Sequence, residues 1–530
     1  MFDVIIENGL IVDGTGAPAY AADVGIRDGI VAEIGQLNGV GARDRVDAKG
    51  RAVTPGFIDI HTHSDFTLLV DGSADSQVMQ GVTMEVVGQC GTSCAPFGDE
   101  MKGDQLVGFI SAGVDVNWRS FAQYLERLDQ ASLGVNVAAM VGHGNIRRAV
   151  KGDSTSMTTT DELKKMIYVA EECFEAGAIG FSTGLEYFPG NIAPQHEIAS
   201  LCQCCAHHGL LYATHVRNRD VYYDLGFTEA IATARHAGAR LQISHIQPKY
   251  GAPKNAMTST LELIARAKRE GVDVAYDVIP HDWSHTGIVA ALPVWAREGG
   301  VEALRARLRD PVQRELMKHN PQPIWRLVTD RKWADIVLLR SLANPELVGQ
   351  SFQEIGRRRN TDPFDAALDL LLEEGEGMTE MLWTSHSFSE KDVRQCIEQQ
   401  ECAVMSDTLA LSRHAAMQPV IGSLSGFGWT ARLLGHYVRD TGVLSLEAAV
   451  RKITSLPAER LGLTGRGHLA IGTSADIAIF DPATVKDNAT LTKPKMHPDG
   501  FSHVLLNGIF TLRDGERTPS NPGKVIRKSH

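Results

Sequence analysis

The stretch from Gly56 to Asp65 reads GFIDIHTHSD, an apolar run that ends in two histidines separated by one residue. The apolar part has the length of a short strand, and a parallel strand covered on both faces reads as a nearly continuous apolar run. Alternate side chains of a strand point the same way, so His61 and His63 can face one common space. The stretch therefore predicts a buried parallel strand that delivers two imidazoles at its carboxyl end.

Seven further segments repeat this design, with amphipathic stretches such as 161–175 and 261–270 between them. Alternating strands and helices are typical of a parallel α/β fold, and eight such units close into a (β/α)8 barrel of the TIM type. The eight strand candidates are GFIDI (56–60), TMEVVG (83–88), VNVAAMVG (135–142), AIGFS (178–182), LLYAT (210–214), RLQIS (240–244), VDVAYDVI (272–279) and CAVMS (402–406). A ninth segment, MLWTS (381–385), competes for the seventh place, and the sequence leaves that choice open.

Short strand-like segments with tight-turn signals stand near both ends of the chain. They cover 3–12, 22–34, 475–480 and 503–507, and Asp-Gly or Asn-Gly pairs lie beside them. Such pairs are typical of two-residue hairpin turns. We therefore predict a small β-sandwich domain that is built from both termini, with residues 1–54 and 464–530 as its two parts.

The barrel is expected to span 55–463 and to carry an inserted segment. Between 282 and about 345 the alternation of strands and helices stops, and several Trp and Pro residues appear. An insertion after a late barrel strand would lie on the face where the carboxyl ends of the strands meet, which is where barrel enzymes bind their substrates.

Composition excludes several classes of protein. The formal net charge of −12 over 530 residues argues against a nucleic-acid partner, since a phosphate backbone is bound mainly by Lys and Arg. The chain lacks a run of 18 apolar residues, so no membrane span is predicted, and its start lacks the features of a signal peptide, so a cytoplasmic protein is expected. Cys202, Cys204 and Cys205 are expected to be core residues. Whether the chain forms homo-oligomers stays open.

Polar side chains with metal-binding atoms follow five of the eight predicted strands. They are His61 and His63 after the first strand, Cys90 after the second, His215 after the fifth, His245 after the sixth and Asp407 after the eighth. The carboxyl ends of all barrel strands converge on one face, so these residues should surround one pocket. One histidine alone is readily explained as structural, but five chain-distant positions at strand ends together predict a site for Zn²⁺.

The same segments resemble the amidohydrolase superfamily, and in particular its N-acyl-D-amino-acid deacylase (D-aminoacylase) branch. The motifs that carry the resemblance are TPGFIDIHTHSD (54–65), GVTMEVVGQCGTSCAP (81–96), GHGNIR (142–147), STGLEYFPG (182–190), YATHVRN (212–218), ISH (243–245), LPVWAREGG (292–300), MSDTLA (405–410) and TSLPAERLGLTGRGHLAIGTSADIAIFDP (454–482). The resemblance implies one tightly bound zinc ion held by Cys90, His215 and His245. It implies a second, weaker metal position at His61 and His63, with Cys90 able to bridge the two metals and Asp407 nearby.

The resemblance further implies hydrolysis of the amide bond of a small molecule, an N-acyl-D-amino acid or a related N-acyl amine. A zinc-bound water has a pKa of about 7 and supplies hydroxide at neutral pH. Asp407 is the predicted general base and acid. His143 and Tyr187 are predicted as second donors to the oxyanion, with a purely structural hydrogen bond as the alternative for each.

Cationic side chains near the predicted site are candidates for binding the substrate. Arg217, Lys249 and Arg413, together with Tyr187, are the predicted substrate-binding residues, and a solvated charge is the alternative for each cation. The pattern departs from the family here: the Lys after His245 falls two places later than usual, and the His-Pro-Arg run expected after the eighth-strand Asp is missing.

Two other functions remain open at the level of the sequence. The same chemistry would serve a cyclic amide such as a hydantoin, dihydropyrimidine or lactam, or a carbamate. A barrel that has lost catalysis and acts as a scaffold is the alternative from a different class. It would be expected to lack metal ligands, whereas all six are present in the sequence.

Overall fold

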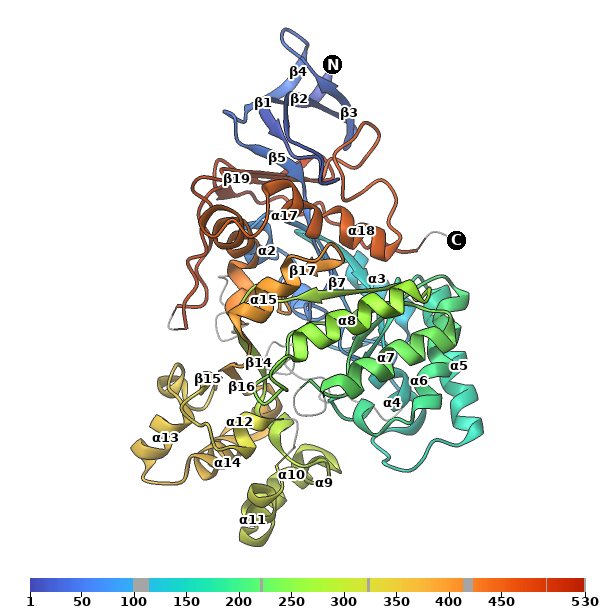
Figure 1. Cartoon of the computed structure of the whole chain (residues 1–530), viewed down its shortest axis with the longest axis vertical. Coiled ribbons are helices and arrows are strands. Elements are labelled where there is room, and N and C mark those ends of the chain that lie inside the picture. Colours follow the sequence, from blue (N-terminus) through green and yellow to red (C-terminus); the bar gives the residue numbers. More distant parts are fainter. Residues whose placement is uncertain (99–113, 220–222, 322–324, 413–422, 492, 529–530) are drawn as a thin grey trace.

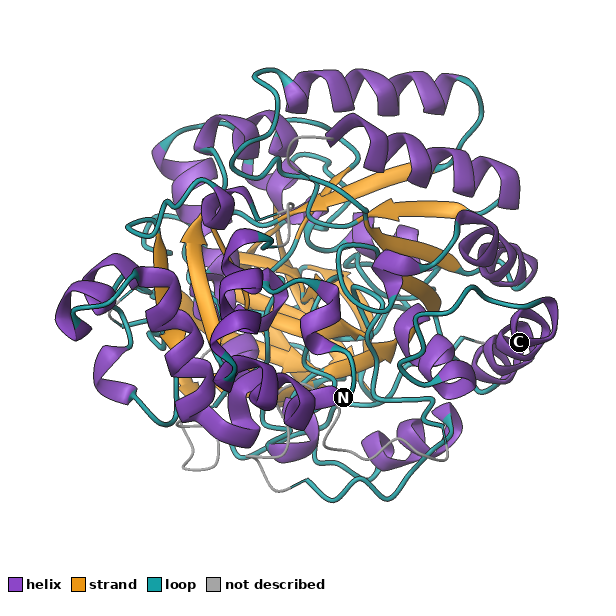
Figure 2. Ribbon diagram, turned by 90° about the horizontal axis from the view of Figure 1, so that it is seen from below, coloured by secondary structure: helices purple, strands orange, loops and turns teal. Residues whose placement is uncertain are grey.

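The computed structural model describes residues 1–98, 114–219, 223–321, 325–412, 423–491 and 493–528. Within these ranges the middle of the chain forms a barrel of parallel strands, and Figure 2 shows the strands gathered at the centre with helices around them. The strands are β6 (Phe57–Asp59), β7 (Val82–Val87), β8 (Asn136–Ala139) with β9 (Val141–Gly142), β10 (Gly180–Gly184), β11 (Leu211–His215), β12 (Arg240–Ile243), β13 (Val274–Val278) and β17 (Cys402–Val404).

The strands pair in the order of a closed barrel. One parallel sheet runs β6-β7-β8 and another runs β9-β10-β11-β12-β13-β17, and β8 and β9 are consecutive parts of one strand on either side of Met140. A parallel bridge between Thr62 and Thr408 joins the end of β6 to the end of β17. All eight predicted strands are therefore confirmed, and β13 takes the seventh place.

Helices cover the outside of the barrel and begin where the sequence provides caps. The Thr159 side chain accepts the backbone N–H of Glu162, whose own side chain accepts the N–H of Thr159, so α5 starts with a reciprocal cap. The helices around the barrel are α1 (Thr67–Val70), α2 (Asp75–Val78), α3 (Phe121–Asp129), α4 (His143–Lys151), α5 (Thr160–Glu175), α6 (Gln195–His207), α7 (Tyr223–Ala237), α8 (Ala256–Arg269), α15 (Glu390–Ile397), α16 (Trp429–Ala431), α17 (Leu446–Lys452) and α18 (Ser455–Leu461).

An inserted segment with its own core follows β13. Its antiparallel sheet has the order β14-β16-β15, and its helices lie at the lower end of the molecule in Figure 1. The elements are β14 (Trp283–Gly287), α9 (Val294–Arg297), α10 (Gly300–Arg309), α11 (Pro311–His319), α12 (Arg326–Thr329), β15 (Ile336–Arg340), α13 (Phe352–Arg359), α14 (Pro363–Glu374) and β16 (Leu382–His386).

Two sequence-based expectations about this segment change. The segment MLWTS forms β16 of the inserted sheet, where it pairs antiparallel with β14 and β15, and so it is not a barrel strand. The insertion therefore reaches His386 and does not end near residue 345. Its separate hydrophobic core, which includes Trp383 and Met381, explains why the segment looks like a buried strand.

Both termini contribute to one nine-stranded sheet, the terminal β-sandwich sheet, at the upper end of Figure 1. β5 links the two parts, since it pairs with β1 on one side and with β18 on the other. The strands are β1 (Phe2–Ile11), β2 (Tyr20–Arg27), β3 (Ile30–Gly35), β4 (Ala42–Asp47), β5 (Ala52–Pro55), β18 (Ile477–Phe480), β19 (Phe501–Leu506), β20 (Ile509–Arg513) and β21 (Glu516–Arg517). The turn at Asp28 and Gly29 has positive φ at both residues, as a tight hairpin requires.

The cysteines, the lengths of the helices and the amphipathic stretches are each the subject of an expectation. Cys202, Cys204 and Cys205 are buried in the main core and carry no disulfide, as predicted. A search of the described helices finds none with both the length and the apolar character needed to cross a bilayer. The amphipathic stretches expected at 161–175 and 261–270 are found in α5 and α8.

Candidate metal centre

The residues predicted as metal ligands meet at the carboxyl ends of the barrel strands. Four of them are buried: His61, Cys90, His215 and His245. The side chains of Asp407 and His63 are 16% and 30% exposed to solvent. Their positions follow from the chain: each lies at the last residue of a barrel strand or within a few residues of its end. The structure therefore brings all six predicted ligands to one place.

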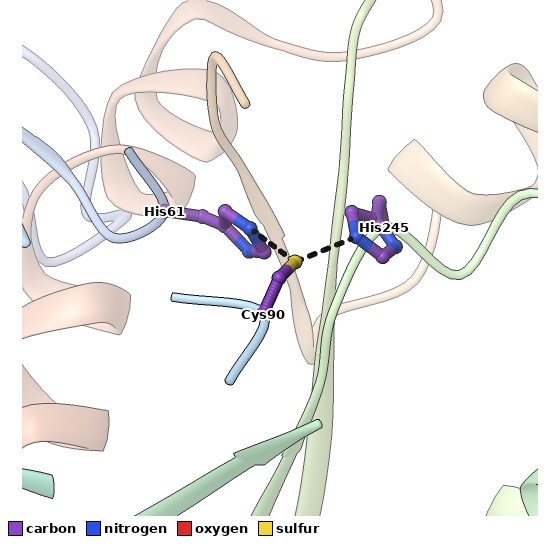
Figure 3. A group of neighbouring side chains, drawn as sticks. All are labelled: His61, Cys90 and His245. Atoms are coloured by element: carbon purple, nitrogen blue, oxygen red, sulfur yellow. Dashed lines mark hydrogen bonds between the residues drawn. The ribbon is translucent and has the colours of Figure 1, made fainter. Parts of the chain in front are cut away.

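The Cys90 sulfur lies at the centre of three imidazoles. Its distance is 3.4 Å to His61 Nε2, 3.3 Å to His245 Nε2 and 3.7 Å to His215 Nδ1. Figure 3 shows the sulfur between the His61 and His245 rings, with one nitrogen of each ring facing it.

Asp407 lies beside two of the imidazoles, those of His61 and His63. Its Oδ1 atom lies 3.2 Å from His63 Nε2 and 3.5 Å from His61 Nε2. Among the described residues, ligand atoms that all lie within 4.8 Å of one another form two groups. The first donor group is His61, Cys90 and His245, and the second donor group is His61, His63 and Asp407, so that His61 belongs to both.

The distances and the atom types fit zinc. A tetrahedral zinc ion with Zn–S of about 2.3 Å and Zn–N of about 2.0–2.1 Å separates sulfur from nitrogen by about 3.6 Å. The three sulfur–nitrogen distances of 3.3, 3.4 and 3.7 Å lie close to that value. A donor set of one thiol and several imidazoles also favours zinc, whereas magnesium and calcium favour oxygen donors.

Electrostatics favours the ionised forms of two predicted ligands, Cys90 and Asp407. Burial alone would raise the pKa of the Cys90 thiol, but the charges of His61 and His245 and hydrogen bonds from His215 and His245 lower it well below its ordinary range. Burial likewise opposes ionisation of Asp407, whose pKa is lowered well below the ordinary carboxyl value by the hydrogen bond to His63 and the nearby imidazoles. A thiolate and a carboxylate are the forms that bind metal.

Three of these ligands have left-handed backbone. The φ angles are 51° at Cys90, 33° at His245 and 50° at Asp407. Such angles cost a residue with a side chain about 1–3 kcal/mol and persist only where the surrounding structure holds them. The contacts that hold these three backbones in place therefore bear directly on the geometry of the predicted ligands.

Ser182 holds the turn that presents the thiol. Its hydroxyl donates to the carbonyl of Gly88 at 2.6 Å and accepts the backbone N–H of Gly91 at 3.0 Å. One side chain of β10 thus joins both ends of the Cys90 turn (residues 88–91). The turn also packs directly on Gly184, where an added Cβ would lie 2.0 Å from the carbonyl oxygen of Cys90.

Removing the Ser182 hydroxyl is expected to weaken zinc binding. Ser182→Ala leaves a carbonyl and an N–H of the Cys90 turn without their partner, so the left-handed turn is no longer held, and zinc affinity should fall about 10- to 100-fold. Competition with a chromophoric chelator measures that affinity. Thr183→Val is the matched control, because the Thr183 hydroxyl contacts Thr214 and Tyr212 instead of the turn. Equal zinc affinity in wild type and Ser182→Ala would refute the role of Ser182.

A second layer of side chains orients the imidazoles. The Asp277 carboxylate accepts the backbone N–H of His245 at 2.6 Å, and the same oxygen lies 3.6 Å from His61 Nδ1. Glu186 Oε2 lies 2.7 Å from His215 Nε2. Burial opposes ionisation of Glu186, but Lys249 and His215 lower its pKa far below the ordinary value. Carboxylates behind metal-binding histidines fix the tautomer and the direction of the ring.

Of the two residues predicted as donors to the oxyanion, one borders the site and the other does not. The Tyr187 ring lies 4.7 Å from the His215 ring and so borders the site. His143 is instead bonded to Glu197 at 2.7 Å in a buried network that includes Arg147, which favours the structural alternative for this histidine.

The predicted substrate cations are engaged by the protein itself. The Arg217 guanidinium pairs with Glu229 at 2.9 Å and donates to the carbonyls of Asn191 and Ala193. Lys249 pairs with Glu186 at 2.7 Å. Arg413 lies outside the described residues.

His285 is a residue that reasoning from the sequence did not single out. Burial lowers its pKa, and Asp407, His63 and Cys90 are among the charged groups that act on it. His285 belongs to β14 of the inserted sheet, where no strand-end signal exists. Glu186 was also missed, although it lies inside the motif STGLEYFPG, because a glutamate there has no pattern that marks it.

Comparison with known proteins gives matches over the whole chain. The profile of the amidohydrolase family matches residues 44–304 and 403–511, which leaves out most of the inserted segment. The N-acyl-D-glutamate deacylase of Alcaligenes xylosoxydans xylosoxydans is 34% identical over 527 residues, which cover 99% of this chain and 96% of that protein.

Solved structures agree with the sequence match. The N-acyl-D-glutamate deacylase from Bordetella bronchiseptica, in complex with zinc and a phosphonate mimic of the tetrahedral intermediate, superposes with a TM-score of 0.84 at 31% identity, covering 99% of this chain and 100% of that one. A D-aminoacylase with a binuclear metal centre, in which one metal activates and the second attenuates, gives a TM-score of 0.82 at 30% identity, with both chains fully covered.

Proposed function

Because the chain belongs to the amidohydrolase family, in its D-aminoacylase branch, we propose that it hydrolyses the amide bond of an N-acyl-D-amino acid or a related N-acyl amine. The observation that carries this proposal is the convergence of the Cys90 thiolate, three imidazoles and Asp407 at the mouth of the barrel. Relatives with the same full-length match act on N-acyl-D-glutamate, and one binds zinc.

In this proposal Cys90, His215 and His245 hold one zinc ion, and His61, His63 and Asp407 offer a second metal position. A zinc ion held by these residues would supply the activation of water near neutral pH and the polarisation of the scissile carbonyl. The short distances from one sulfur to three ring nitrogens support the first position, and the shared His61 supports a second one close by.

Asp407 is the proposed group that moves the proton. Its carboxylate is ionised, so it can accept a proton from the attacking water and pass it to the departing nitrogen. The imidazoles of His63 and His61 hold Oδ1 from one side, which fixes the direction of the carboxylate.

Tyr187 is the proposed donor to the oxyanion. Burial and the charge of Cys90 raise the pKa of Tyr187 well above its ordinary value, so its hydroxyl keeps its proton. A protonated hydroxyl next to His215 can donate to the oxygen on which negative charge develops.

A substrate panel tests the proposed function. The zinc-loaded protein is expected to hydrolyse N-acetyl derivatives of some D-amino acids to acetate and the free amino acid. It should act far more slowly on the L-enantiomers and on hydantoins. Treatment with a chelator should abolish turnover and added zinc should restore it, since the chemistry depends on the metal. Turnover of a hydantoin with no turnover of any N-acyl amino acid would replace the proposal with the cyclic-amidase alternative.

A further inference from the structure

Glu186 lies behind His215 and is fully enclosed by protein. Its Oε2 atom lies 2.7 Å from His215 Nε2 and 2.7 Å from Lys249 Nζ, so one oxygen serves both partners. The other oxygen, Oε1, accepts the backbone N–H of Arg219 at 3.1 Å. With both oxygens engaged, the carboxylate has one orientation, and the His215 ring is aligned with it.

Lys249 connects this carboxylate to the inserted segment. Its ammonium lies 4.2 Å from the centre of the Trp325 ring, which is the residue before α12. Trp325 packs edge-on against Trp383 of β16, with ring centres 5.6 Å apart. A cation on an aromatic face is attracted to it, most strongly where water is excluded. Lys249 is therefore held from two sides, by a carboxylate of the barrel and by an indole of the insertion.

This placement conflicts with a role for Lys249 as the cation that binds the substrate carboxylate. The side chain is 4% exposed and its charge is balanced by a carboxylate that is itself inaccessible. Taking Lys249 away from Glu186 would remove the cation that balances this buried carboxylate, which is destabilising. The ammonium contacts the Glu186 carboxylate and the face of the Trp325 ring.

We propose that Glu186 and Lys249 act as a positioning pair: Glu186 holds the His215 ring with Nδ1 towards the metal, and Lys249 acts on the metal site only through Glu186. The inference rests on the proposed function in one respect, since it takes His215 to be a zinc ligand. It extends that function because it gives Lys249 a supporting role in metal binding. Through Trp325, it also links the inserted segment to the metal site.

Zinc affinity of single and double variants tests the pair. Glu186→Gln keeps the shape of the side chain but loses the charge-assisted bonds, and zinc affinity should fall about 10- to 100-fold. Lys249→Met should lower affinity in the same direction and by a smaller factor. Because Lys249 acts through Glu186, the double variant should bind zinc no more weakly than Glu186→Gln alone, which is the non-additivity expected of residues in one network.

Two further measurements separate positioning from a general loss of stability. The visible spectrum of the Co²⁺-loaded protein reports the geometry of the ligands, and it should change in Glu186→Gln and in Lys249→Met. The matched control is Glu380→Gln, which breaks the buried Arg340–Glu380 pair of the inserted segment, 2.7 Å long. That control should unfold more easily than wild type yet keep its zinc affinity and its Co²⁺ spectrum.

The outcomes are distinguishable. Unchanged zinc affinity in Glu186→Gln, or a double variant whose loss is the product of the two single losses, would overturn the pair while leaving the proposed function in place. If Glu186→Gln fails to fold, Lys249→Met and its Co²⁺ spectrum decide: an unchanged spectrum overturns the pair. A wild-type protein that binds no zinc would overturn the metal centre itself, and the pair with it.

Discussion

Replacing Asp407 with asparagine is expected to lower kcat by about 10²- to 10⁴-fold, the range that general acid–base catalysis contributes. Asparagine keeps the size of the side chain and can still accept hydrogen bonds from His63 and His61, but it cannot take up the proton of the attacking water. Cys90, His215 and His245 are unchanged, so the protein should retain about one zinc ion per chain. Steady-state kinetics and elemental analysis on the same sample measure both quantities.

Asp476→Asn is a suitable control for this variant. Asp476 is a buried carboxylate of the terminal sheet that bonds the backbone N–H of Asn507 at 2.7 Å and pairs with Arg466, far along the chain from any metal ligand. Its replacement should affect stability and leave kcat per folded molecule unchanged. If Asp407→Asn kept the kcat of wild type, the proton transfer would have to be assigned to another group.

Replacing Cys90 with alanine is expected to remove both zinc and turnover. The sulfur faces three imidazoles, and its thiolate supplies negative charge that neutral rings cannot supply. Mutation of a residue that only orients a metal ligand already lowers metal affinity about 10- to 100-fold. Loss of a direct ligand should therefore lower zinc affinity at least about 100-fold. Titration with zinc under a competing chelator, followed by a deacylation assay, tests the prediction.

Cys173→Ala provides the comparison. Cys173 is equally buried and equally free of disulfides, but it lies on α5 on the outside of the barrel. Its removal should reduce stability by the few kcal/mol or less that a small core truncation costs, with zinc content and kcat retained. A Cys90→Ala protein that bound zinc as tightly as wild type would contradict the ligand assignment.

The barrel and most of its ligands could be predicted because both depend on short-range features of the chain. Strands such as β7 and β13 are buried along their whole length and read as largely apolar runs, which is the expected pattern for a parallel barrel. His61, Cys90 and His245 follow directly after such runs. Topology then brings them together without any further information, since all carboxyl ends of the strands share one face.

The remaining features depend on contacts that no local pattern encodes. β16 is as buried as a barrel strand, but it packs in the separate core of the insertion, and composition alone does not say which core a strand joins. Arg217 reads as a cation beside His215, yet its partner Glu229 lies on the following helix. Likewise, Glu186 becomes a partner of His215 only when the loop after β10 folds back onto β11.

The way that β5 joins the two parts of the terminal sheet has a consequence for biosynthesis. β5 is complete once residue 55 has been made, but its neighbour β18 begins only at residue 477. Until then the ribosome-bound chain carries a sheet whose edge is open and whose apolar face is uncovered, the condition under which nascent proteins aggregate. Synthesis at about 5–20 residues per second keeps that edge exposed for tens of seconds, so we expect the nascent chain to benefit from a chaperone or from early folding of the barrel.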